Sequence, residues 1–517
     1  EDLQTAVILE PKRSLLRSYL GKAFTDAGRA TNAALELHLA QALDPRDPTP
    51  WLYSALLNED YNRFNDAVGD LEKSIALNDN RAVYRSQLLL DEDRAVRGAN
   101  LAAIYRRAGL AEVGVSEAAR AVTADYANHS AHLFLANSYN ELRDPALANL
   151  RYETATFSEY LVANLLSPVG GSALSPRVSQ QEYTRLFARD RLGLTSETTY
   201  LSSGDWQQSA SQYGWLGNTG YALDVYYRSQ NGERINNDLE QQAYSIQLKQ
   251  QLTPSDSVYL QAIFSLYEGG DVRQLYDGGM ADPGLRVKEQ QLPNLFVGYH
   301  HQWSPGIHTL LLAGRLADDL RLRTPATGVL ALETNSVGAI TGALPAAWSQ
   351  FDLRYRSEFE AMTFEGQQIL ELAAHTLILG ARYQGGETKT EAELRYVGPI
   401  FGLFEPSYHQ ENSTDLTRLS VYAYDNWELL DSLCLSAGLA YDRITYPVNI
   451  DSAPISDVEM EKRRLSPKAG LIWAPDNRTT VRASYTRSLG GLFYDQSVRL
   501  EPTLVAGLNQ AYRSLVP

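Results

Sequence analysis

The stretch Leu416–Arg443, LTRLSVYAYDNWELLDSLCLSAGLAYDR, holds two runs of alternating apolar and polar residues on either side of a short polar turn. An alternation with a period of two predicts β-strands whose two faces meet different media. Aromatic residues such as Tyr422, Trp427 and Tyr441 suit a boundary between water and an apolar phase. The stretch is therefore predicted to be a hairpin of a transmembrane β-barrel. We assign to its lipid face Leu419, Val421, Leu435 and Leu439, and to its lumen face Ser420 and Ser436.

A second hairpin of this kind occupies Leu465–Arg487. The two hairpins resemble late strands of TonB-dependent outer-membrane receptors, which often have the forms Y-x-x-D-x-W, L-x-L-x-A-G-L-x-Y-D and S-P-K-x-G-L-x-W. These forms begin here at Tyr422, Leu433 and Ser466. The resemblance covers the C-terminal part of the chain best. It implies an antiparallel β-barrel in contact with the lipid of a Gram-negative outer membrane.

The N-terminal part carries a repeat with helical character. Pro11 and Pro45 are 34 residues apart, and small and large apolar residues recur between them. This arrangement resembles the tetratricopeptide repeat, in which small residues let two antiparallel helices approach closely. The pattern predicts four repeats over residues 14–163. The positions that carry the resemblance in the first two repeats are Leu20, Gly21, Phe24, Ala33, Leu37, Ala40, Ala55, Ala67 and Leu71.

The period changes from 3.6 to 2 beyond a linker rich in Pro, Gly and Ser. We predict a multidomain α + β chain: a TPR-like α-solenoid over 1–165, a linker over 166–190 and an antiparallel transmembrane β-barrel over 191–517. The chain opens halfway through a repeat, and its barrel lacks a closing strand, so we expect the natural protein to continue at both ends. Thirteen strands are predicted at 191–200, 206–214, 219–229, 241–251, 258–267, 293–303, 308–316, 351–371, 375–384, 417–427, 433–442, 465–473 and 479–488.

The connections between these strands alternate in length, as they do in outer-membrane barrels with short periplasmic turns and long outer loops. This asymmetry predicts extracellular long loops and a periplasmic repeat domain. Two of the loops, 317–350 and 385–416, contain small and apolar residues and are predicted to fold inward as a lid. The long loops are predicted at 268–292, 317–350, 385–416 and 443–464.

The composition excludes several classes of function. With 46 Lys and Arg against 62 Asp and Glu, the net charge is −16, which argues against nucleic acid as a partner. A single cysteine, Cys434, excludes a disulfide within the chain. The sequence contains no nucleotide loop, metal motif or nucleophile elbow, so we expect no cofactor, no metal and no enzymatic activity.

A binding groove is predicted in the repeat domain instead. The first helix of each tetratricopeptide pair lines a concave groove, where Asn, Lys and Arg can hold an extended peptide or a chain-end carboxylate. A hydrated surface with packed aromatic residues is the alternative. The partner would be a periplasmic protein or peptide. The residues that the resemblance places in this groove are Lys22, Tyr53, Asn100, Arg106, Arg107, Phe134, Asn137 and Asn140.

Three functions are compatible with this organisation. TonB-dependent receptors carry a plug domain before the barrel, whereas here helical repeats hold that place and the linker is too short for a plug. We therefore predict an unplugged export or assembly pore that passes a polymer or protein outward. A receptor-like uptake barrel whose plug lies elsewhere is one alternative. A non-conducting outer-membrane scaffold that anchors a surface assembly is the other.

Overall fold

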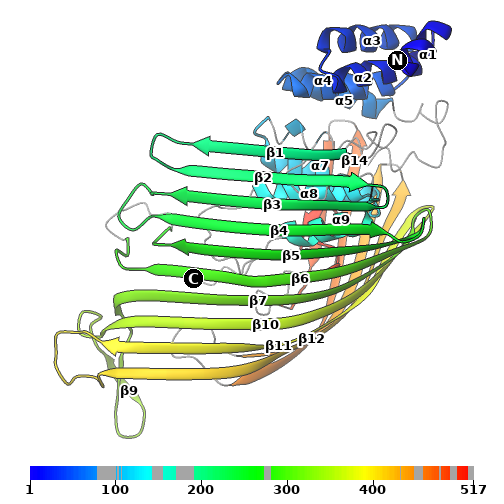
Figure 1. Cartoon of the computed structure of the whole chain (residues 1–517). Helices are drawn as coiled ribbons and strands as arrows, with labels where there is room; N and C mark the ends of the chain where they lie inside the picture. The colour runs from blue at the N-terminus through cyan, green and yellow to red at the C-terminus, as the bar shows by residue number, and fades with distance from the viewer. Residues whose placement is uncertain are drawn as a thin grey trace.

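The structure is a computed structural model of the 517-residue chain. Helices come first and a large curved sheet follows (Figure 1). The residues that the structure describes are 1–77, 101, 104–105, 108–141, 155–169, 191–272, 281–430, 432–447, 458–476, 479–489 and 498–510.

The first helices form pairs, as predicted. Helix α2 packs on α3, and α4 packs on α5. At Gly21 a Cβ atom would lie 2.7 Å from Cγ of Leu37, so the close approach of α2 and α3 depends on a residue without a side chain. Their assignment as tetratricopeptide repeats stays a prediction, and parts of the third and fourth predicted repeats lie outside the described residues. The helices are α1 (Asp2–Leu9), α2 (Ser14–Asp26), α3 (Ala30–Leu43), α4 (Thr49–Asp60), α5 (Phe64–Ala76), α7 (Ala111–Ala124), α8 (His129–Glu141) and α9 (Ala155–Leu166).

The sheet has 13 antiparallel strands, the number predicted, and each strand pairs with its neighbour in sequence. In the described part of the chain β1 and β15 form its two edges, and the sheet is open. A separate hairpin of β8 (Leu332–Thr334) and β9 (Ile340–Ala343) lies in the connection between β7 and β10. The strands of the sheet are β1 (Arg191–Tyr200), β2 (Trp206–Leu216), β3 (Thr219–Gln230), β4 (Leu239–Gln251), β5 (Asp256–Gly269), β6 (Arg286–Ser304), β7 (Ile307–Gly328), β10 (Gln350–Leu372), β11 (His375–Tyr396), β12 (Ser407–Leu430), β13 (Leu433–Pro447), β14 (Glu459–Asp476) and β15 (Thr479–Thr486).

Several strands run further than predicted, and the longest extensions enter the expected long loops. The predicted loop 385–416 is strand as far as Tyr396 and again from Ser407. The period of two continues there, with Thr388 and Thr390 buried on one face, but the other face carries charged residues such as Lys389. The prediction followed apolar alternation, and the strands continue beyond the apolar band.

The two faces of the hairpin within Leu416–Arg443 are those predicted. Leu419, Val421 and Leu439 are 43%, 48% and 46% exposed on the convex face, which suits contact with lipid. Leu435 lies on that face and is half-buried. Ser420 and Ser436 are buried on the concave face, 1% and 6% exposed.

We expect an arginine on the convex face to destabilise the sheet in a membrane. Val421→Arg should cost about 2 kcal/mol, since it places a charge on the exposed apolar face that we expect to meet lipid. Reversible unfolding in liposomes measures this change, with Val421→Ala as the control for lost side-chain volume. Equal stability of the two variants would contradict a lipid-facing position.

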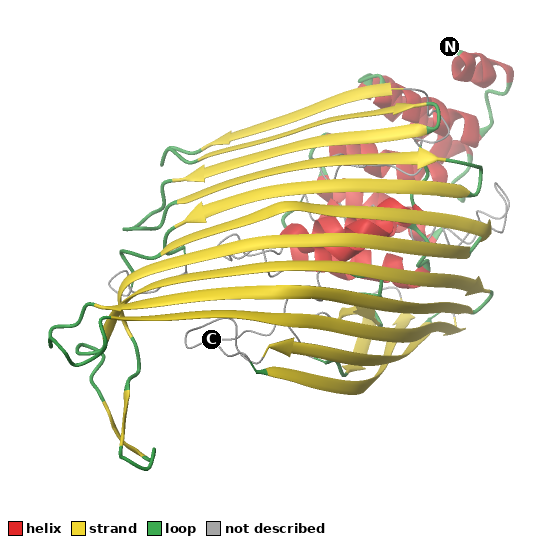
Figure 2. Ribbon diagram, turned by 60° about the horizontal axis from the view of Figure 1, so that its bottom comes forward, coloured by secondary structure: helices red, strands yellow, loops and turns green. Residues whose placement is uncertain are grey.

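Helices α7–α9 cover the concave face of the sheet, while α1–α5 form a separate group (Figures 1 and 2). Helix α9 packs directly on β5 and β6. Residues 498–510, which contain the short strands β16 (Leu504–Val505) and β17 (Leu508–Asn509), lie against β13, β14 and β15. None of the described helices is long and apolar enough to cross a membrane.

Candidate functional site: the occupied concave face

A buried lysine of the sheet caps the C-terminal end of helix α9. Lys249 of β4 is 0% exposed, and its Nζ donates hydrogen bonds to the main-chain oxygens of Asn164, at 2.5 Å, Leu165, at 2.9 Å, and Ser167. The last carbonyls of a helix lack partners within it, and the helix dipole makes this end negative. One ammonium group therefore satisfies both needs and fixes α9 to the sheet.

Apolar contacts continue the attachment of α9. At Gly298 of β6 a Cβ atom would lie only 2.1 Å from Cδ2 of Leu165, so the absence of a side chain makes room for this leucine. The rings of Phe157 and Phe296 lie 5.2 Å apart between their centroids. The helix is thus seated over a position in the strand that is glycine for steric reasons.

A polar cluster holds the middle of α9. Tyr160 donates a hydrogen bond to Oε1 of Gln247 over 3.0 Å, and Tyr259 donates to the same oxygen over 3.3 Å. The side-chain amide of Gln247 donates in turn to Asp224 of β3 over 3.0 Å. Burial raises the pKa of the Tyr160 phenol well above its usual range, so it stays a neutral donor.

The segment 498–510 is held on the concave face by a carboxylate of β10. Glu365 accepts hydrogen bonds from the main-chain N–H groups of Leu500, over 2.8 Å, and Glu501, over 3.1 Å. Tyr422 of β12 also donates to Glu365, over 2.8 Å. Gln367 donates to the carbonyl oxygen of Leu500 over 2.5 Å. Side chains of the sheet therefore satisfy the backbone of this segment.

Glu501 adds a charged attachment. Its side chain is 6% exposed, accepts a hydrogen bond from Tyr424 and lies 2.9 Å from Nζ of Lys468. Burial opposes ionisation of Glu501, but Lys468, Arg499 and Arg382 outweigh it and hold the pKa of this carboxyl well below its usual range. The segment is thus anchored by a buried ion pair as well as through its backbone.

One network joins the helices to the segment 498–510. Thr503 donates a hydrogen bond to Glu159 of α9, and the other oxygen of Glu159 contacts Nδ1 of His132 on α8. Nε2 of His132 lies 2.7 Å from the carbonyl oxygen of Tyr126. The phenol of Tyr126 donates to the carbonyl of Leu500 over 3.4 Å, which closes the connection. The helices and the segment therefore form one unit on the concave face.

The residues predicted for a groove lie in two different places. Lys22 is buried on α2 and lies 3.2 Å from Asp26, and Tyr53 is buried among α2–α5. Phe134 is buried on α8 in the cluster between the helices and the sheet, and Asn137 is half-buried beside it. The structure therefore does not bring Tyr53 and Phe134 together. Binding of a peptide by these residues stays a prediction. Outside the described residues or side chains lie Asn100, Arg106, Arg107 and Asn140.

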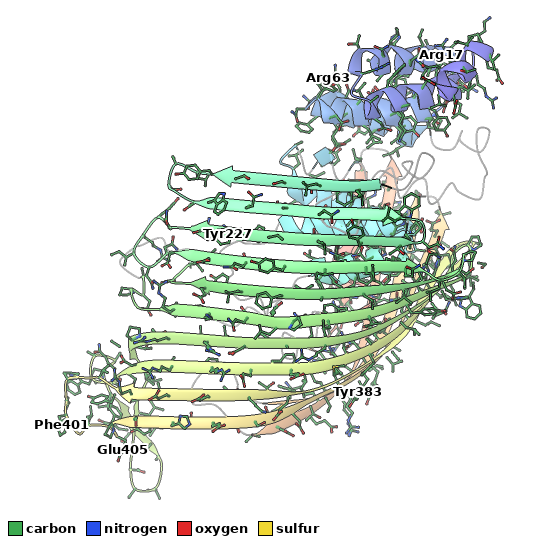
Figure 3. The ribbon with its side chains drawn as sticks, in the orientation of Figure 1. Arg17, Arg63, Tyr227, Tyr383, Phe401 and Glu405 are labelled. Atoms are coloured by element: carbon green, nitrogen blue, oxygen red, sulfur yellow. The ribbon has the colours of Figure 1, made fainter. Side chains whose placement is uncertain are left out.

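The structure contradicts the expected lid. Figure 3 shows Phe401 and Glu405 beyond the ends of the strands, away from the concave face. Contacts at the base of this loop hold it outward. The ring centroids of Phe404 and Phe351 lie 5.3 Å apart, and the Tyr396 hydroxyl donates a hydrogen bond to the carbonyl oxygen of Trp348 over 2.9 Å. The expectation of an unobstructed interior is also wrong, because α7–α9 and the segment 498–510 occupy it.

Comparison with known proteins follows this architecture. The family model described as "TonB dependent receptor-like, beta-barrel" matches residues 24–511. The chain belongs to the TonB-dependent receptor-like β-barrel family. Members of the TonB-dependent receptor family are transporters of the bacterial outer membrane. The predicted barrel class is thereby confirmed, and the family favours the uptake alternative over an export pore.

Several solved receptors are similar to this TonB-dependent receptor-like chain. The ferripyoverdine receptor of Pseudomonas aeruginosa is 12% identical, with a TM-score of 0.41, over 57% of this chain and 42% of the receptor. The copper transporter OprC is 9% identical, with a TM-score of 0.43, over 57% of this chain and 44% of the transporter. BauA, the ferric preacinetobactin receptor of Acinetobacter baumannii, is 14% identical, with a TM-score of 0.39, over 57% of this chain and 46% of the receptor. The chain spans less than half the length of each, and no protein with curated annotation matches it.

Proposed function

We propose that this TonB-dependent receptor-like protein takes up a ligand across the outer membrane, and that α7–α9 with the segment 498–510 form its gate. The observation that carries the proposal is the occupied concave face. Its attachments include, beside apolar packing, hydrogen bonds and ion pairs from side chains of the sheet, among them Lys249, Glu365 and Lys468. Groups of this kind can exchange partners with water or a ligand at a small net cost.

The proposed gate takes the role of the plug, whose location the uptake alternative did not specify. That alternative required a plug located elsewhere, and in this structure the occluding elements belong to the chain itself. An open export pore would need the concave face free for its cargo. The family match and the occupied face together support uptake through a gate that opens transiently.

A disulfide between α9 and β6 should lock the gate. Leu165→Cys with Gly298→Cys suits this purpose, because a Cβ at residue 298 would lie 3.4 Å from Cγ of Leu165. Cγ of Leu165 marks roughly where the Sγ atom of Leu165→Cys would lie, and an S–S bond of about 2.0 Å can span this separation. The background is Cys434→Ser, which removes the single native cysteine. Cells that express the wild-type protein should deplete a solute from their medium. Cells that express the oxidised double variant should not.

Controls separate a gate from other causes of lost uptake. Reduction of the disulfide should restore depletion, and each single cysteine variant should remain active under oxidising conditions. A protonophore should stop depletion by the wild type, because energised uptake depends on the proton gradient. Appearance of a solute in the medium would favour export. Uptake by the oxidised double variant at the wild-type rate would contradict a gate that includes α9.

A further inference from the structure

Four basic side chains are buried where the sheet meets the segment 498–510, and they differ in their partners. Arg418 lies 2.8 Å from Asp442, and Lys468 lies 2.9 Å from Glu501. Arg499 lies 3.8 Å from Glu501. Arg382 of β11 is 1% exposed and forms no close ion pair among the described residues, although the carboxylates of Glu365 and Glu501 act on its charge from further away. Arg382 is therefore the exception in this group.

The guanidinium of Arg382 is largely unsatisfied. Nη1 donates one long hydrogen bond, of 3.5 Å, to the carbonyl oxygen of Val498. Among the described residues, neither Nε nor Nη2 of Arg382 has an acceptor, and the same holds for Nε of the neighbouring Arg499. A buried N–H without an acceptor is costly. In the described part of the chain, the guanidinium of Arg382 therefore has free N–H donors that a charged acceptor could fill better than the carbonyl of Val498 does.

The carboxylate that could serve Arg382 is used elsewhere. Glu365 is its direct neighbour across the β10–β11 pair. Both oxygens of Glu365 instead accept hydrogen bonds from the backbone of Leu500 and Glu501 and from Tyr422. Ser420 is the neighbour of Arg382 on the other side and bonds to Asp442. The structure thus directs the nearby polar groups away from the arginine fork.

We propose that Arg382, assisted by Arg499, binds an oxyanion of the transported ligand, a carboxylate or a phosphate. A planar guanidinium fits two oxygens of such a group at once. The oxyanion takes the place of the carbonyl of Val498, so its binding displaces the start of the segment 498–510. The inference deepens the proposed function and rests on it for the identity of the ligand as cargo.

The test is a calorimetric titration of the purified full-length protein in detergent. Sodium phosphate and sodium citrate are the probes, and sodium chloride at equal ionic strength is the reference. We expect at least one probe to bind, and the arm that responds identifies a phosphate or a carboxylate. Arg382→Gln should weaken this binding about ten- to hundredfold, which corresponds to one or two charge-assisted hydrogen bonds. Arg315→Gln is the matched control, since Arg315 already pairs with Glu360, over 2.8 Å.

Thermal unfolding without anion separates binding from a structural role. Arg382→Gln relieves a buried guanidinium but also removes a counter-charge from Glu365 and Glu501, so we expect a Tm close to that of the wild type. If this variant does not fold, Arg499→Gln replaces it and should also weaken binding. Absence of binding of both probes to the wild type would overturn the proposal, and so would unchanged affinity in Arg382→Gln. Solute depletion by cells is measured separately, so the anion site can fail while uptake stands.

Discussion

Replacing Lys249 with methionine should detach helix α9 and make the outer membrane leaky. Methionine keeps most of the apolar stem of the side chain, but the main-chain oxygens of Asn164, Leu165 and Ser167 lose their donor. Each hydrogen bond from a charged donor contributes about 1.5–3 kcal/mol, so we expect α9 to be held about 3–5 kcal/mol less tightly. Cells that express the variant should become sensitive to vancomycin, which an intact outer membrane excludes.

A second lysine of the same sheet provides the control for this variant. Lys288 of β6 pairs with Glu268, and both side chains are substantially exposed. Lys288→Met removes a positive charge without touching α9 and should leave the permeability unchanged. If Lys249→Met cells resisted vancomycin as the wild type does, the cap on α9 would not be needed for closure.

Replacing Glu365 with leucine should free the segment 498–510. Two buried main-chain N–H groups, of Leu500 and Glu501, would lose their acceptor, at about 1–3 kcal/mol each. Tyr422 would lose its acceptor as well. Val505 is 2% exposed, so a cysteine there reports on release. In Val505→Cys with Cys434→Ser, a membrane-impermeant maleimide should label residue 505 at least about tenfold faster once Glu365 is leucine.

Glu360 on the opposite face of β10 offers the comparison. Its side chain is 63% exposed and pairs with Arg315. Glu360→Leu should leave the labelling of residue 505 as slow as in the parent. Equally slow labelling in the Glu365→Leu protein would show that Lys468 and the rest of the segment hold it without the carboxylate.

The sequence predicted the sheet because lipid imposes a simple rule on the convex face. Apolar residues such as Val421 must alternate with residues of the interior, and this period of two identified all 13 strands of the described sheet. Strand ends were predicted less well. Beyond the apolar band the convex face carries charged residues such as Lys389, while the concave face carries polar ones. The alternation there is between polar and charged residues, so it does not stand out as an apolar pattern.

The site could not be predicted in the same way. Glu365 and Lys468 look like ordinary interior residues of a barrel, since their strands show only that they face inward. Their partners lie in the segment 498–510, which has no periodic pattern of its own. The one signal available was a charge at an inward position of a strand, as for Lys249, because such a charge needs a counter-group when it is buried. That signal indicates a partner but not its identity.

The two parts of the proposed gate lie before and after the sheet in the sequence, and this separation affects how the molecule is assembled. The hydrogen bond between Tyr126 and Leu500 spans 374 residues, and that between Thr503 and Glu159 spans 344. Contacts of such high sequence separation form late, because the loops between them must close first. Helices α7–α9 precede every strand of the sheet in the chain, whereas the segment 498–510 follows them all. The segment 498–510 can dock only after β10–β14 are in register, because several of its partners lie on these strands.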